Sequence, residues 1–118
     1  MDYNRRMTTW KNELKTEFKM AQDALDVKNY GKMRVCARRA AGIAIREYLQ
    51  ARGIAPPSVS AYDLLKFLDE MDDTSADIRQ ASVYLRLRVT EEFRLPVDVD
   101  LVAEAKKICT TLTPGWEK

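Results

Sequence analysis

Apolar residues recur along this chain at spacings of three and four, the pattern of helices that bury one face. No run shows the strict apolar–polar alternation of a half-buried strand, and short polar or Pro- and Gly-containing stretches separate the periodic segments. We therefore predict an all-α fold, an antiparallel up-and-down bundle of four to five helices. The expected helices span residues 9–27, 30–52, 60–71, 76–94 and 101–112.

The segment 30–52 is apolar on several sides, which is typical of a helix at the centre of a bundle. One of its faces carries mostly alanine, and such small side chains allow close helix approach. We expect Gly53 to follow its last turn as the C′ residue.

Residues with short polar side chains precede the other segments and predict where the helices begin. Ser60 is followed by Asp63 in the spacing of a capping box, and Ser75 precedes a first turn that contains Asp77. The expected caps of the remaining helices are Thr8 or Thr9 for the first and Asp98 or Asp100 for the last.

A chain of 118 residues predicts one domain, with a core over about 9–112 and flexible ends at 1–7 and 113–118. The sequence leaves open whether Trp116 folds back on the bundle or contacts a partner. No apolar run is long enough to cross a membrane, and the first residues do not resemble a signal peptide. We therefore expect no membrane association and a cytoplasmic location.

Histidine is absent, which removes histidine-based acid–base catalysis, Ser/His and Cys/His nucleophile pairs, and most zinc sites. The phosphate-loop, dinucleotide-binding and zinc-protease motifs are absent as well. Cys36 and Cys109 are isolated in apolar segments, so we predict buried, reduced thiols. We expect no cofactor and no metal.

Charge is distributed unevenly although the net charge is only +2. Residues 1–58 carry twelve Lys and Arg against six Asp and Glu, whereas residues 59–118 carry eight against twelve. This separation is compatible with solvated faces of opposite sign, intramolecular pairing, self-association or a phosphate-binding face. Arg34 and Arg38 lie on one side of the helix at 30–52 and are candidates for phosphate binding. Arg39 and Arg46 lie about a quarter-turn further round.

The segment 76–94 carries two further arginines, Arg79 and Arg86, seven residues apart and so on one side of a helix. They are candidates for phosphate binding, with pairing to Asp or Glu inside the fold as the alternative. Val83, Tyr84 and Leu87 form a second apolar patch on the far side, which predicts an oligomer interface.

The chain resembles the HEPN family (higher eukaryotes and prokaryotes nucleotide-binding domain) over roughly Trp10 to Leu112. The segment Cys36–Leu49 is similar to the Ala-rich central helix of that family. Ser60–Leu68 is similar to its short third helix with paired leucines, and Ala103–Ile108 to its final helix.

The resemblance implies a bundle that commonly forms a homodimer, and many members are ribonucleases or toxins encoded beside a nucleotidyltransferase. Their active motif is an Arg and a His with four to six residues between them. Counting from Arg86 or from Arg88, that histidine position is Phe93 in this chain. Gly42 stands where many members carry Glu. A phenyl ring transfers no proton, so the resemblance implies a degenerate site.

We therefore expect a HEPN-like protein that acts by binding RNA, a nucleotide or a nucleotidyltransferase partner, with a toxin–antitoxin role as one context. Arg79, Arg86, Arg88, Arg38 and Arg34 are the predicted phosphate ligands. One alternative is a histidine-free ribonuclease. A second alternative is a structural module that forms homo-oligomers.

In the ribonuclease alternative, Arg86 or Arg88 would stabilise the phosphate transition state. Tyr84, Glu91 or Glu92 would then move the protons.

Overall fold

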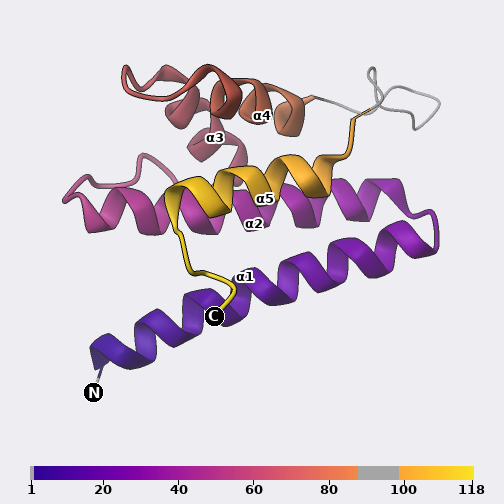
Figure 1. Ribbon diagram of the computed structural model, residues 1–118, viewed down its shortest axis with the longest axis horizontal. Helices are drawn as coiled ribbons and strands as arrows, with labels where there is room; N and C mark the ends of the chain where they lie inside the picture. The colour runs from indigo at the N-terminus through magenta and orange to yellow at the C-terminus, as the bar shows by residue number, and fades with distance from the viewer. Residues whose placement is uncertain (1, 88–98) are drawn as a thin grey trace.

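The structure, a computed structural model, describes residues 2–87 and 99–118, with side chains from residue 9 onward. It contains five α-helices in its described part and confirms the all-α prediction (Figure 1). The helices are α1 (Asp2–Asp26), α2 (Tyr30–Ala51), α3 (Ala61–Glu70), α4 (Ala76–Arg86) and α5 (Leu101–Leu112).

Helix α2 is the centre of the bundle, because it contacts each of the other four helices. Figure 1 shows α2 and α5 in the middle of the molecule, with α1 on one side and α3 and α4 on the other. Helices α1 and α4 run in one direction and α2 and α5 in the opposite one. The short helix α3 joins α2 to α4 and packs against both.

Small side chains on α2 let its neighbours approach closely. Ala37, Ala40, Ala41 and Ala44 are fully buried, and Gly42 is buried too. A Cβ at Gly42 would lie 3.0 Å from Ala61 Cβ and 3.2 Å from Ala61 Cα. Gly42 therefore sets the distance between α2 and the first turn of α3.

The predicted helix caps Ser60 and Ser75 are present, and Asp100 is the one used of the two aspartates expected before α5. Each side chain accepts a hydrogen bond from the backbone N–H three residues later, at distances of 3.4, 3.3 and 3.0 Å. Gly53 has φ of +74°, as expected of a C′ residue after α2. Asn29 caps α2, a role that the sequence analysis had not assigned.

Two predicted boundaries are wrong. Helix α1 begins at Asp2, before the expected caps Thr8 and Thr9, and no glycine or proline interrupts this turn-and-a-half of chain. Helix α4 ends at Arg86 and Leu87 is extended, with ψ of 142°. A helix continuing to residue 94 would need the Leu85 and Leu87 carbonyls for its own backbone, but arginine side chains from α2 occupy them.

The carboxyl-terminal segment folds back onto the bundle, which answers the question left open for Trp116. Its indole is 5% exposed and lies on Phe18, with ring centroids 5.0 Å apart. The indole Nε1 donates a hydrogen bond to Thr110 Oγ1 at 3.3 Å. This packing joins the end of the chain to α1.

Cys36 and Cys109 are both buried and unpaired, as predicted. Within the described ranges, none of the helices combines the length and the apolar character needed to span a membrane.

We predict that Gly42→Val destabilises the protein by about 1–3 kcal/mol, because the added methyl groups overpack the contact with Ala61. Gly31→Val is the matched control, since a Cβ at Gly31 meets nothing within 4 Å. Urea unfolding followed by circular dichroism would measure both. Equal stabilities of the two variants would contradict the close approach of α3 to α2.

Candidate functional site

Arg79 satisfies the carboxyl end of α3 and the turn that follows it. Its guanidinium donates hydrogen bonds to the carbonyls of Met71 at 2.7 Å, Thr74 at 3.1 Å and Asp72 at 3.4 Å. These carbonyls lie at and beyond the end of a helix, where cations are favoured. Arg79 therefore has internal partners, but they are carbonyls rather than the carboxylates expected.

Arg86 is also held inside the fold. It donates to Asp69 at 2.9 Å in an ion pair that is largely shielded from solvent, and to Ser82 Oγ at 3.4 Å. Ser82 is fully buried and donates in turn to the Leu65 carbonyl at 2.7 Å. This network ties α4 to α3, and it corresponds to the internal pairing considered as the alternative for Arg86.

Arg34 and Arg38 converge on the carboxyl end of α4. Arg34 Nη1 donates to the Leu87 carbonyl at 2.7 Å, and Arg38 Nε donates to the Leu85 carbonyl at 2.8 Å. Burial, and then the neighbouring charge of Arg34, lower the pKa of Arg38 from its usual value. These two arginines from α2 therefore satisfy carbonyls at the carboxyl end of α4.

The three residues of the predicted oligomer interface differ in exposure and do not form one exposed patch. Val83 is exposed, whereas Tyr84 packs against the core and Leu87 is half-buried at the end of α4. Arg88 and Phe93 lie outside the described residues. Because α4 ends at Arg86, the continuous helix expected over residues 76–94 is interrupted at Leu87.

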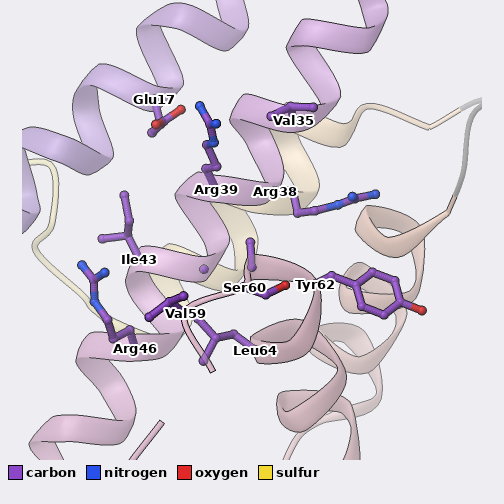
Figure 2. A pocket seen from close by; sticks show the side chains of 12 residues that line it. Glu17, Val35, Arg38, Arg39, Ile43, Arg46, Val59, Ser60, Tyr62 and Leu64 are labelled. Atoms are coloured by element: carbon purple, nitrogen blue, oxygen red, sulfur yellow. The ribbon is translucent and has the colours of Figure 1, made fainter. Parts of the chain in front are cut away.

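A pocket of about 400 Å³ opens between α1, α2 and the first turn of α3 (Figure 2). It combines basic, apolar and hydroxyl side chains with one carboxylate. Its lining residues are Glu17, Val35, Arg38, Arg39, Gly42, Ile43, Arg46, Val59, Ser60, Ala61, Tyr62 and Leu64.

Arg38, Arg39 and Arg46 give this pocket its positive charge, and Arg38 is held by the Leu85 carbonyl. Among the described residues, Arg39 makes no hydrogen bond or ion pair, and it is exposed. Arg46 has only long contacts, 3.7 Å to Glu13 and 3.9 Å to Glu47. These two guanidiniums are therefore open to a ligand, unlike those that hold helix ends.

Glu17 faces the same pocket from α1 and points toward Arg39 (Figure 2). Its Oε2 atom is buried and has no hydrogen-bond partner in the described part of the chain. Glu17 also acts on Cys36 of α2, whose pKa is raised first by burial and then by the negative charge of Glu17. The carboxylate thus stands at the boundary between the pocket and the core.

Tyr62 and Val59 form an apolar rim around the pocket. Val59 is 96% exposed and Tyr62 is 41% exposed, and the guanidinium of Arg38 lies 6.0 Å from the centroid of the Tyr62 ring. Val35 adds a third exposed apolar side chain from α2. An open apolar rim beside free guanidiniums suits a ligand that joins a flat apolar part to an anion.

Of the predicted phosphate ligands that the structure describes, only Arg38 lines this pocket. Arg39 and Arg46 lie on a different side of α2 from Arg34 and Arg38 and are not among the predicted phosphate ligands. Their seven-residue spacing puts them on one face, with Gly42 between them. This spacing is the sequence feature that identifies the pair. The pocket beside Gly42 is not visible in the sequence, because it depends on where α3 begins.

The described residues contain no group of three His, Cys, Asp or Glu side chains placed to hold a metal ion. No protein-family model, no curated protein and no solved structure matches this chain.

We predict that Arg79→Ala destabilises the protein by about 1.5–3 kcal/mol, because it leaves the carbonyls at the end of α3 without their charged donor. Arg39→Ala should change stability by no more than about 0.5 kcal/mol, since Arg39 bonds to no described residue. Thermal and urea unfolding would compare the two. A larger loss of stability for Arg39→Ala would show that Arg39 stabilises the fold and is not available to a ligand.

We predict that Glu17→Gln lowers the pKa of Cys36 and so speeds its alkylation a few-fold at fixed pH, because a nearby negative charge is removed. Iodoacetamide labelling with mass-spectrometric mapping would separate Cys36 from Cys109. Asp23→Asn removes a charge from the exposed side of α1 and is the matched control. Equal rates for Cys36 in both variants would contradict the placement of Glu17.

Proposed function

We propose that this chain is a HEPN-like binding protein whose pocket between α1, α2 and α3 takes a nucleotide, either free or as a unit of RNA. The observation that carries the proposal is Arg39, a guanidinium without a hydrogen bond or ion pair to any described residue. Arg46 lies two turns further along α2 with only long acidic contacts. Arginine suits phosphate because its planar fork makes paired hydrogen bonds.

The apolar rim supports a nucleotide over inorganic phosphate alone. Val59, Tyr62 and Val35 are three of the six large apolar side chains exposed in the described ranges, and all three line this pocket. The Tyr62 ring lies on the opposite side of the pocket from Glu17 (Figure 2) and offers a surface on which a second base of an RNA stacks. Such a contact is worth about 1–3 kcal/mol in single-strand recognition.

Binding without cleavage is the activity we propose. Histidine is absent from the sequence, and Arg86 is engaged by Asp69 and Ser82. Binding by Arg39 and Arg46 requires charge and shape but no proton transfer, which agrees with the side chains at the pocket.

The HEPN resemblance belongs to the same proposal, and so do the partners that it implies. A second copy of the chain or a nucleotidyltransferase would then associate with this bundle. The all-α architecture with a central Ala-rich α2 is compatible with that assignment.

We predict that AMP and short oligoadenylate bind the protein, and that Arg39→Ala and Arg46→Ala each weaken binding about tenfold by removing a charged hydrogen-bond donor. Isothermal titration calorimetry at two salt concentrations would measure this, with weaker binding at the higher one. Adenosine, which has no phosphate, should bind much more weakly than AMP.

Arg52→Ala is the matched control, because Arg52 lies on the same helix but stacks on Tyr48 outside the pocket, 4.3 Å from its ring centroid. The oligonucleotide should be recovered intact after the titration, in EDTA and in magnesium. Undiminished binding by the Arg39 and Arg46 variants would overturn the pocket assignment, and cleavage of the RNA would overturn the proposal of binding alone.

A further inference from the structure

Binding of a phosphate does not explain the carboxylate of Glu17 in the pocket between α1, α2 and α3. A negative charge at the wall of a pocket weakens phosphate binding. The positive charge of Arg39 nearby does not neutralise it through an ion pair, since no hydrogen bond or ion pair joins the two side chains. The ligand group that contacts Glu17 should therefore be a hydrogen-bond donor, unlike a phosphate oxygen.

The carboxylate of Glu17 has unused capacity to accept hydrogen bonds. Its Oε2 atom is buried and accepts none in the described part of the chain. Glu17 also lines the pocket, so its carboxylate is within reach of a ligand bound there. An ionised carboxylate only accepts hydrogen bonds, so the ligand group that meets it has to be an N–H or O–H donor.

We propose that Glu17 accepts a hydrogen bond from the exocyclic amino group of the nucleotide base and thereby selects among bases. This inference rests on the proposed nucleotide function of the same pocket. Adenine, cytosine and guanine carry such an amino group. Uracil has carbonyl oxygens that the carboxylate repels, and its N3–H donor lies between two of them. The pocket therefore prefers nucleotides with an amino-bearing base.

The layout of the side chains in Figure 2 agrees with this assignment. Glu17 and Arg39 lie at one end of the pocket, and Arg46 lies beside Val59 at the other. Arg39 and Arg46 are seven residues apart, so their Cα atoms are separated by about 10 Å along α2. A phosphate held between the Arg39 and Arg46 guanidiniums thus leaves the base free to reach toward Glu17.

The test compares ligands with and without the amino group. AMP is titrated against purine riboside 5′-monophosphate, which has hydrogen in place of the amino group, and CMP against UMP. We expect AMP to bind about tenfold more tightly than its deaminated analogue, because a hydrogen bond to a charged group is lost. CMP should exceed UMP by at least the same factor, since UMP adds a repelled carbonyl.

Glu17→Gln separates a specific hydrogen bond from a general effect of the pocket. The amide of glutamine both accepts and donates, so this variant should bind CMP and UMP alike while still requiring the phosphate. Asp23→Asn, on the same helix beyond the pocket, should keep the preference of the parent protein.

The outcomes distinguish the two proposals. Equal binding of AMP and its deaminated analogue, with Arg39→Ala still weakening both, overturns the base selection and leaves nucleotide binding in place. A preference that survives in Glu17→Gln likewise overturns the role of Glu17. Absence of binding by every nucleotide overturns the proposed function itself.

Discussion

Close packing against α2 is the constraint on which the bundle depends. Four helices share the surface of this one helix, and they approach it closely because five of its nine buried residues are alanine or glycine. A larger side chain at Gly42 would push α3 outward, and α3 in turn carries Ser60, Ala61 and Tyr62 into the pocket. The same close approach therefore creates the core and shapes the candidate site.

Arginine side chains provide a second level of organisation by satisfying the ends of helices. Arg79 binds carbonyls at the end of α3, while Arg34 and Arg38 bind those at the end of α4. Helix ends leave carbonyls without intrahelical partners, and a cation is favoured there. Most arginines that stand out in the sequence are thus used within the fold.

This division of roles changes which basic residues are candidates for function. Arg39 has no hydrogen bond or ion pair to a described residue, and Arg46 has only the longer ion pairs to Glu13 and Glu47, whereas Arg86 meets Asp69 at 2.9 Å. A phosphate or nucleotide therefore has two accessible guanidiniums in one pocket. Glu17 adds the opposite charge at its edge and makes the pocket suitable for a ligand with both an anion and an N–H donor.

The five helices, the central place of α2 and most of their caps follow from local patterns: apolar spacing, Ser and Asp before first turns, and Gly53 after the last turn of α2. Such features depend on neighbours in the chain. The early end of α4 and the separation of bound from free arginines depend on residues about fifty positions apart, as with Arg34 and Leu87. Helical spacing gives the side of a helix on which an arginine lies, but only the packed bundle decides whether a carbonyl, a carboxylate or open solvent faces it.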